Sequence, residues 1–462
     1  MQSLDFYKDK QVLVLGLAKS GVAVTKLLAG AGAKVTVNDQ KERSKCPEAE
    51  ELEALGISVV CGGHPSSLIH SEVALVVKNP GIPYSAKPIE QACELGIEVV
   101  TEVEVAYLVC RAPIYAITGS NGKTTTTTWV GKMLEAAELK PIVAGNIGRS
   151  LCDAAEEASQ ENRMVVELSS FQLKGTQQFR AHIACLLNIY ETHLDYHGSM
   201  DDYIAAKGKI FTNQTENDIA VINWDDAQCR AFLPFIKARL FPFSMNTELQ
   251  QGVFLSDEMI VARDHSGVFH SIVALQELGV PGRHNVENAL AATAIALSAG
   301  VSVDLITQVL RSFRGVEHRL EFVIEREGVT YINGSKATNP AATIKDMESF
   351  KQKIVLIAGG LDRGMDYLEL LPYFREKLRG IVTLGETSAK LIHVAQQAGI
   401  ESYYSVDTAN TPAQAFTEAV LAANRFAFDG DVVLLSPACA SWDMFSSFEE
   451  RGRMFKEAVH NL

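Results

Sequence analysis

The stretch IYAITGSNGKTTTTTWVGKMLEAA, residues 114–137, joins a buried-type strand, a glycine turn and a segment with helical spacing. This order is the context of a phosphate-binding loop, in which backbone N–H groups and the helix N-terminus hold an anion. The usual pattern, G-x-x-x-x-G-K-[ST], is longer, because here Gly119 and Gly122 stand directly ahead of Lys123 and Thr124. The stretch therefore predicts a compact phosphate loop, with Lys123 as a mobile charge and Thr124 placed to hold Mg²⁺.

Short β-branched runs alternate with helical patterns along the rest of the chain, for example QVLVLG, AKVTVND, RMVVEL, KIVLIAGG and DVVLLSP. Such alternation predicts βαβ units on mostly parallel sheets, an α/β fold. A chain of 462 residues is too long for one core, so we expect three domains, at residues 1–110, 111–316 and 317–462. Residues 241–280 have little helix signal and predict a β-rich elaboration of the middle domain.

Composition excludes several classes of protein. The net charge of −14 argues against sequence-independent binding to DNA, RNA or an anionic membrane, because phosphates demand a basic surface. The eight cysteines form no C-x-x-C pair and no His/Cys cluster, so we expect reduced thiols in a cytoplasmic protein. The first apolar run, VLVLGLA, is too short for a signal peptide or a membrane span.

A second glycine turn lies in VLVLGLAKSG, residues 12–21. Gly16, Ala18 and Gly21 stand at G-x-G-x-x-G positions, and Asp39 ends the following strand. NAD and a nucleotide-sugar diphosphate both remain possible ligands, because either would use the turn and the helix N-terminus. The segment KNPGIP, residues 78–83, follows another strand and forms a turn of the same region or a plain loop.

Polar side chains follow the later strands of the middle domain. Asn146 lies in AGNIG after one strand, Glu167 ends another, and His193 and Lys207 come in the segments after that. Each would be a structural or solvated residue if it occurred alone, but together they occupy the strand ends where open sheets bind ligands. Asn288, in GRHNVENALAA, shares a helix face with His284.

The last domain has strand-end loops with charged and hydroxyl groups. Arg319 begins this domain, where its guanidinium could reach phosphates from across a cleft, and Lys336 lies in the polar loop YINGSKATNPAAT. A helix starting near Ser441 would offer free N–H groups to a carboxylate, and Arg363 could grip a second one. A dicarboxylic amino acid suits such a site.

The combination of GSNGKTT, ELSSFQL, HNVENALAA, SKATN and SPACASWDMF resembles the Mur ligase family, ATP-dependent enzymes of bacterial cell-wall precursor synthesis. The SKATN and SPACAS segments favour the members that add D-glutamate. The resemblance implies a Rossmann-like N-terminal domain, a P-loop-type central ATPase domain and a Rossmann-like C-terminal domain. The family pattern D-S-K-A-T-N has Asp where this chain has Gly334, so a carboxylate expected near the nucleotide is missing. Arg363 stands where the family often has lysine.

The implied reaction is an ATP-dependent amide bond formation. ATP phosphorylates the terminal carboxylate of UDP-N-acetylmuramoyl-L-alanine, and the amine of D-glutamate attacks the acyl phosphate. The resemblance implies ATP, two Mg²⁺ ions and a carbamylated Lys207, with small-molecule substrates, no nucleic acid or membrane partner, and a monomer. Alternatives are another ligase of the superfamily such as folylpolyglutamate synthase, an NAD(P)-binding protein with a kinase-like domain, or a nucleotide-gated binding protein.

The resemblance also implies a role for each matching residue. The catalytic residues would be Lys123, Glu167, His193 and Lys207, and the metal ligands Thr124, Glu167, His193 and Lys207. ATP would be bound by Gly119, Ser120, Asn121, Gly122, Lys123, Thr124, Thr125, Asn288 and Arg319. The UDP-substrate would be bound by Leu17, Ala18, Asp39, Gln40, Lys41, Asn79, Gly81, Asn146 and His193. D-Glutamate would be bound by Lys336, Thr338, Arg363, Ser441 and Phe448.

Overall fold

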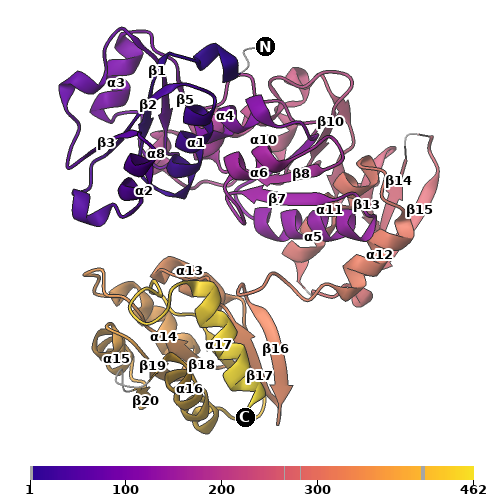
Figure 1. The fold of residues 1–462 in the computed structure, drawn as a ribbon. Helices are drawn as coiled ribbons and strands as arrows, with labels where there is room; N and C mark the ends of the chain where they lie inside the picture. Colours follow the sequence, from indigo (N-terminus) through magenta and orange to yellow (C-terminus); the bar gives the residue numbers. More distant parts are fainter. Residues whose placement is uncertain (1–3, 265, 281, 407–410) are drawn as a thin grey trace. The chain divides into compact units, whose positions relative to one another are not determined.

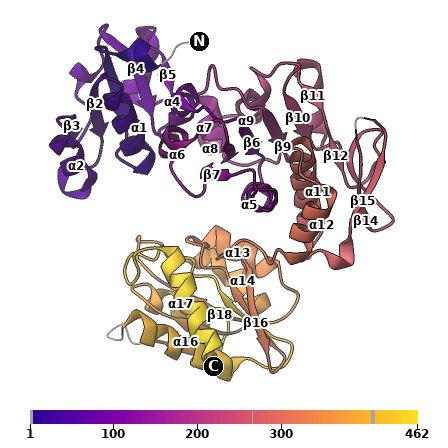
Figure 2. The ribbon, with the colours of Figure 1, turned by 45° about the vertical axis from the view of Figure 1, so that its right-hand side comes forward.

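The structure, a computed structural model, describes residues 4–264, 266–280, 282–406 and 411–462. Three α/β domains with mostly parallel sheets follow one another along the chain, as the alternating pattern predicts (Figures 1 and 2). Residues Met1–Phe313 form one compact unit and Arg314–Leu462 a second, and each is described by itself.

The N-terminal domain is a parallel five-stranded sheet in the order β3-β2-β1-β4-β5. Its strands are β1 (Gln11–Leu15), β2 (Lys34–Asp39), β3 (Ser58–Cys61), β4 (Val73–Lys78) and β5 (Val99–Val100). Its helices are α1 (Lys19–Gly30), α2 (Glu48–Ala54), α3 (Lys87–Glu94) and α4 (Glu102–Val109). The strand order reverses between β1 and β4, so the loops after these two strands meet at a topological switch point.

The central domain has a parallel six-stranded sheet in the order β11-β10-β9-β6-β8-β7. Its strands are β6 (Ile114–Thr118), β7 (Pro141–Gly145), β8 (Arg163–Glu167), β9 (Ile183–Leu186), β10 (Ile219–Ile222) and β11 (Arg239–Leu240). Its helices are α5 (Lys123–Ala136), α6 (Leu151–Glu157), α7 (Ser170–Lys174), α8 (Leu194–His197), α9 (Met200–Gly208), α10 (Ala227–Arg230), α11 (Arg283–Ser298) and α12 (Val303–Ser312). Here the order reverses around β6.

The predicted β-rich elaboration is confirmed. A separate four-stranded sheet consists of β12 (Phe243–Ser244), β13 (Gly252–Ser256), β14 (Met259–Arg263) and β15 (Phe269–Ala274). Its last three strands pair antiparallel, which short loops permit.

The C-terminal domain is a six-stranded sheet in the order β16-β17-β21-β18-β19-β20, antiparallel only at β16. Its strands are β16 (Glu321–Arg326), β17 (Val329–Asn333), β18 (Ile354–Ala358), β19 (Leu378–Thr383), β20 (Ser402–Ser405) and β21 (Val432–Leu435). Its helices are α13 (Pro340–Glu348), α14 (Leu371–Lys377), α15 (Ser388–Gln397), α16 (Pro412–Phe426) and α17 (Phe448–His460). Phe416 and Phe455 fill the core on one face of this sheet, and Phe374 and Leu391 belong to the core on the other.

The N-terminal and central domains share one hydrophobic core. Val24 and Leu28 of α1 belong to the same cluster of buried side chains as Leu151 and Ala155 of α6. Apolar burial of this kind is the main stabilising term in folding, so we treat these two domains as one unit.

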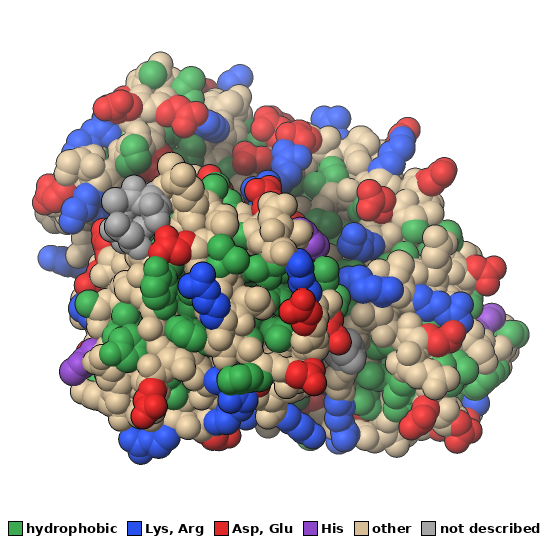
Figure 3. All heavy atoms as spheres, turned by 90° about the horizontal axis from the view of Figure 1, so that it is seen from below, with side chains coloured by type: hydrophobic (Ala, Val, Ile, Leu, Met, Phe, Trp, Pro, Cys, Tyr) green, Lys and Arg blue, Asp and Glu red, His purple; other side chains and the backbone are tan. Residues whose placement is uncertain are grey.

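Surface chemistry agrees with the composition. On the face drawn in Figure 3, acidic and basic side chains are interspersed, so this face has no extended basic area. Among the helices that the structure describes, none combines the length and the apolar character that crossing a bilayer requires.

Candidate active site

Gly122 is the residue that fixes the compact phosphate loop. Its φ is +82°, a conformation that glycine adopts without strain. A Cβ at this position would lie 2.1 Å from Oδ1 of Asn288, so the loop and helix α11 touch where only glycine fits. The structure therefore places Asn288 beside the loop, where the resemblance implies an ATP-binding residue.

Two lysines converge on one carbonyl of this loop. Lys123 Nζ donates to the Gly119 oxygen at 2.8 Å and to the Ser120 oxygen at 2.9 Å. Lys207 Nζ donates to the same Gly119 oxygen at 2.8 Å, although Lys207 lies far along the chain on α9. The Lys207 side chain is buried, and desolvation, followed by repulsion from Lys123, holds its pKa well below the ordinary value for lysine. The second lysine is therefore not the solvated helix residue of the simpler interpretation.

Three further residues hold the loop in place and were missed by sequence reasoning. The Asn121 N–H donates to Oδ1 of Asn188 at 2.9 Å, and the Tyr190 N–H donates to Oγ of Ser120 at 2.8 Å. The Tyr203 hydroxyl lies 2.8 Å from the same Oγ. Asn188 and Tyr190 follow β9, the neighbour of β6, so the strand-end rule could have found them had the strand order been known.

The carboxylate of Glu167 has the position and the hydrogen bonding expected of a cation ligand. The register of the sheet sets Glu167 beside Ile117 on one side and Gly145 on the other, at the carboxyl ends of three strands. Asn146 Nδ2 donates to Glu167 Oε1 at 2.8 Å. Glu167 Oε2 is buried and has no hydrogen-bond partner among the described residues. A buried carboxylate oxygen without a donor suits a hard divalent cation such as Mg²⁺.

Thr124 and His193 differ in burial and in their distance from the loop. Thr124 is buried in the first turn of α5. His193 is exposed, adopts a positive φ of 58° and begins helix α8. Its ring centroid lies 6.4 Å from that of Tyr203, the residue that contacts Ser120. Through Tyr203 the exposed histidine is thus linked to the phosphate loop.

The N-terminal switch point gathers the residues expected to bind the UDP-substrate. The Leu17 N–H donates to Asp39 Oδ2 at 2.7 Å, and the Lys41 N–H donates to Asp39 Oδ1 at 2.9 Å. A Cβ on Gly16 would lie 2.8 Å from Cβ of Asn79, which shows how closely the loops after β1 and β4 approach. Other members of the expected set are solvent-exposed: Ala18, Gln40, Lys41 and Gly81.

Lys78, at the end of β4, is a further residue that the motifs did not single out. Its side chain is buried, and its Nζ donates to the Pro80 oxygen at 3.1 Å and to the Tyr196 hydroxyl at 3.0 Å. Burial lowers its pKa to about 7. Lys78 thus connects the turn of the N-terminal domain to helix α8 of the central domain.

The C-terminal switch point joins the loops after β17 and β21. Arg451, almost fully buried, donates to the Ser335 oxygen at 2.9 Å and to the Cys439 oxygen at 3.0 Å. The Ser335 hydroxyl in turn donates to the Phe448 oxygen at 2.8 Å. Lys336 Nζ lies 5.7 Å from the ring centroid of Phe448. The structure therefore brings Lys336 and Phe448 together.

The remaining expected amino-acid-binding residues lie on adjacent loops. The Leu361 N–H donates to the Ala440 oxygen at 3.0 Å, which joins the loop of Arg363 to that of Ser441. Ser441 is buried, whereas Arg363 is exposed over the ring of Trp442. Thr338 is partly buried and its N–H donates to the Lys336 oxygen at 2.9 Å.

The prediction of a helix beginning near Ser441 is wrong. Residues 441–445 form a turn, in which the Phe445 N–H donates to the Ser441 oxygen, and helix α17 begins only at Phe448. Ser447 caps that helix by accepting from the Glu450 N–H. A serine followed three residues later by Glu is the usual start of a helix, and this signal was overlooked.

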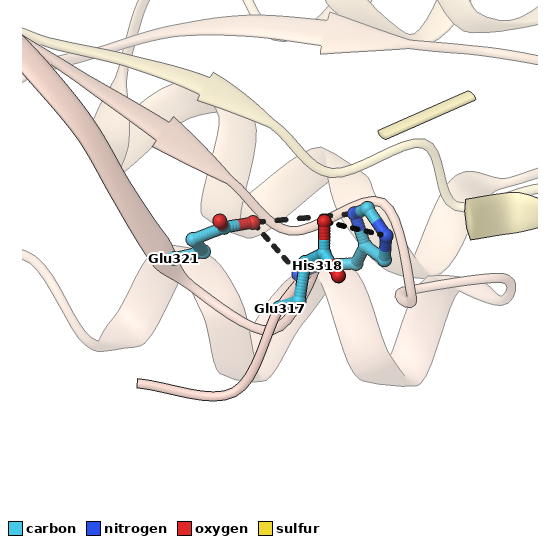
Figure 4. Close-up of side chains that lie close together, drawn as sticks. All are labelled: Glu317, His318 and Glu321. Carbon is cyan, nitrogen blue, oxygen red and sulfur yellow. Dashed lines mark hydrogen bonds and ion pairs between the residues drawn. The ribbon is translucent and has the colours of Figure 1, made fainter. Parts of the chain in front are cut away.

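Arg319 lies beside a cluster of titratable side chains, Glu317, His318 and Glu321 (Figure 4). Lys456 Nζ already supplies a cation here, at 2.7 Å from Glu317 Oε1 and 2.9 Å from Glu321 Oε1. The His318 oxygen accepts the Lys336 N–H at 3.0 Å. The cluster is therefore an ion-pair network that orders the segments of Arg319 and Lys336, not a metal centre.

Comparisons with known proteins agree with this geometry. Family models match at residues 10–101 (Mur ligase MurD-like, N-terminal domain), 117–296 (Mur ligase middle domain) and 318–439 (Mur ligase, glutamate ligase domain). The chain is 47% identical, over 100% of both sequences, to proteins named UDP-N-acetylmuramoylalanine–D-glutamate ligase from Bacillus thuringiensis and Bacillus mycoides.

Solved structures show the same fold. UDP-N-acetylmuramate–alanine ligase from Thermotoga maritima has a TM-score of 0.54 at 20% identity, covering 98% of this chain and 99% of that one. MurF ligase from the same organism, in complex with ADP, has a TM-score of 0.51 at 17% identity over 100% of both chains. With the three matched domains and the full-length relatives, these similarities show that the chain belongs to the Mur ligase family.

Proposed function

We propose that this ligase joins D-glutamate to UDP-N-acetylmuramoyl-L-alanine, with ATP converted to ADP and phosphate. The full-length relatives carry the name of that activity at 47% identity. The observation that carries the proposal is the phosphate loop, where Lys123 and Lys207 meet at one carbonyl beneath the N-terminus of α5. The positive charge of Lys123 and the free N–H groups at the helix start are what a triphosphate requires.

In the first step, an oxygen of the substrate carboxylate attacks the γ-phosphorus of ATP, and ADP leaves. Attack of an anion on an anion needs neutralised charge and fixed alignment. Lys123 and the N–H groups of the glycine turn supply the charge, and Asn288, which touches Gly122, supports the turn. Arg319 adds a guanidinium that stays charged at any working pH.

In the second step, the neutral amine of D-glutamate attacks the acyl carbon, and phosphate leaves from the tetrahedral intermediate. Lys336, Thr338, Arg363, Ser441 and Phe448 hold the amino acid in this proposal. The proximity of Lys336 to Phe448 and the bond between the loops of Arg363 and Ser441 support it. A site with a lysine and an arginine suits an amino acid with two carboxylates.

The UDP moiety is bound at the N-terminal switch point in this proposal. Asp39 anchors the backbone of Leu17 and Lys41, and Asn79 packs against the same turn. Ala18, Gln40, Lys41 and Gly81 offer exposed groups around it. We accordingly assign the UDP-substrate to residues 1–110, ATP to 111–316 and the amino acid to 317–462.

Mg²⁺ neutralises phosphate charge when bound, and Thr124, Glu167, His193 and a carbamylated Lys207 would hold it. The unpartnered Glu167 Oε2 supports this assignment. The lowered pKa of Lys207 supports carbamylation, because only a neutral amine attacks CO₂. The amine nitrogen bonds to the carbon of CO₂ and releases one proton, which leaves a carbamate anion. The modification would be excluded if removing CO₂ and bicarbonate changed neither the intact mass of the protein nor its activity.

The direct test measures release of inorganic phosphate with ATP, UDP-N-acetylmuramoyl-L-alanine and a panel of amino acids. We expect release with D-glutamate and little with L-glutamate, L-alanine or D-aspartate. Omission of either substrate provides the control for uncoupled ATP hydrolysis. Equal release with every amino acid, or tight binding of NADH in a fluorescence titration, would contradict the proposal. Light scattering should show a single species with the mass of a monomer. Cell fractionation should place the protein in the cytoplasm.

A further inference from the structure

The loop after β4 is bound through its carbonyl groups by two side chains from different domains. Lys78 Nζ, at the end of β4, donates to the Asn79 oxygen at 3.3 Å and to the Pro80 oxygen at 3.1 Å. The Tyr196 hydroxyl, on α8 of the central domain, donates to the same Pro80 oxygen at 3.0 Å and lies 3.3 Å from the Ile82 oxygen. Lys78 Nζ and the Tyr196 hydroxyl are themselves 3.0 Å apart. The lysine, the tyrosine and the loop thus form one hydrogen-bonded cluster.

Tyr196 belongs to a single helical turn whose backbone is tied to His193. The N–H groups of Tyr196 and His197 both donate to the His193 oxygen, at 3.2 Å and 3.1 Å. His193 has a φ of 58°, a left-handed conformation that a residue other than glycine keeps only where its surroundings hold it. The position of Tyr196 therefore affects the position of His193 through the backbone of α8.

The same helical turn is anchored in the central domain by its last residue. The His197 ring is buried, with Nδ1 2.6 Å from Asp202 Oδ2 and Nε2 3.0 Å from Ser170 Oγ. The ring of Phe171 packs edge-on against that of Tyr196, with the centroids 4.4 Å apart. Both domains belong to the compact unit Met1–Phe313, so α8 connects them directly beside His193.

Packing alone does not require an amine at residue 78. The side chain of Lys78 is buried, and burial, followed by repulsion from Lys174, lowers its pKa to about 7, whereas Glu102 acts in the opposite direction. A methionine would fill similar space without this desolvation. What the amine adds is donation to two carbonyl groups, and both lie in the segment that the proposed function assigns to the UDP-substrate.

From this geometry we propose that Lys78 and Tyr196 are positioning residues, which lock the loop after β4 to helix α8 and so align the bound UDP-substrate with His193. Neither side chain touches the substrate in this assignment, because each acts through the loop or through the backbone of α8. Fixed alignment of the reacting groups is a large part of the rate of a group transfer. The inference rests on the proposed function, because it takes the UDP-substrate to lie at the N-terminal switch point and His193 to take part in the reaction.

A split between turnover and substrate binding tests this role. Tyr196→Phe removes only the hydroxyl, and Lys78→Met replaces the amine by an apolar side chain of similar length. Misplacement of reacting groups costs up to about 100-fold in rate, so kcat should fall by about 10- to 100-fold in each variant. The calorimetric dissociation constant of the UDP-substrate and KM for ATP should change by less than about three-fold, because the groups that touch these ligands remain. Thermal unfolding should show both variants folded at the assay temperature.

The double variant decides whether the two side chains act together. If both hold one loop in one place, Lys78→Met combined with Tyr196→Phe should lose little more than the larger single loss, because residues that share one network are not additive. Lys34→Met, at an exposed position at the start of β2, is the matched control for a lost lysine and should keep the wild-type kcat. Tyr403→Phe, at an exposed position of β20, is the control for a lost hydroxyl.

Several results would overturn the inference. They are an unchanged kcat in Tyr196→Phe, a rise in the dissociation constant of the UDP-substrate that equals the fall in kcat, and single losses that multiply in the double variant. A loss of kcat that follows the loss of folded protein would assign both side chains a structural role instead. Failure of the proposed function is distinct, because the wild type would then release no phosphate with D-glutamate and the UDP-substrate.

Discussion

The glycine turns after β1 and after β6 both connect a strand to a helix but have opposite chemistry. After β1, a carboxylate of Asp39 accepts the Leu17 N–H. After β6, the Gly119 carbonyl accepts from Lys123 and Lys207. The side-chain partner of the first turn is therefore a carboxylate, and the side-chain partners of the second turn are two amines. In the proposed assignment, side chains from neighbouring strands and helices, and not the glycine spacing, decide which turn receives the triphosphate.

Removing the amine of the second turn is the strongest way to break this comparison. Lys123→Ala should lower kcat/KM for ATP by about 10³-fold, as loss of a preorganised charge in a transition state does. Binding of the UDP-substrate by calorimetry should change by less than about two-fold, since Lys123 lies outside the first turn. The exposed Lys132 on the same helix provides the matched control, Lys132→Ala. Loss of both ligands in Lys123→Ala would contradict separate sites.

Removing the acid of the first turn gives the reciprocal result. Asp39→Asn keeps one acceptor but loses the charge that holds two backbone N–H groups, so KM for the UDP-substrate should rise about ten-fold. KM for ATP should stay unchanged. Glu50→Gln, at an exposed position of helix α2, is the control for a lost negative charge. A larger effect on ATP than on the UDP-substrate would reverse the assignment of the two turns.

A pair of glycine substitutions sharpens the comparison at the level of packing. A Cβ on Gly21 would lie 2.0 Å from the Gly16 oxygen, and one on Gly122 would lie 2.1 Å from Asn288 Oδ1. Gly21→Ala should destabilise the protein by about 1–3 kcal/mol, because a backbone atom must move. Gly122 has a positive φ, so Gly122→Ala should distort the loop and mainly raise KM for ATP. Gly30→Ala, whose Cβ meets nothing within 4 Å, should be neutral or slightly stabilising in thermal unfolding.

A pH dependence of stability is expected beside the first turn, at Lys78. Lys78 has a pKa of about 7 in the folded protein and 10.5 as an ordinary lysine. Between these values only the unfolded chain binds the proton, so stability falls as pH drops from about 10 to about 7 and is level below. In Lys78→Met, which has no ionisable group at this position, the unfolding temperature should lose this part of its dependence on pH between pH 7 and 10. An unchanged slope would mean that Lys78 stays charged between Lys174 and Glu102.

Local patterns were enough to predict the α/β class, the three domains and the compact loop, whereas a role for Asn288 at the nucleotide came only from the family resemblance. They were not enough for contacts that depend on strand order, such as those of Asn188 and Tyr203 with the loop. The solvated interpretation of Lys207 failed for the same reason, since the side chain is buried against the end of β6 and the loop after it, far away in the chain. The displaced start of α17 is different, because the capping serine was visible in the sequence.

The hydrophobic core that α1 and α6 share has a practical consequence. A recombinant fragment that ends at Phe313 keeps this core intact and retains both glycine turns. Such a truncated product should express as a stable reagent, suited to small-molecule screening against the proposed UDP-substrate and ATP sites without interference from the proposed amino-acid site.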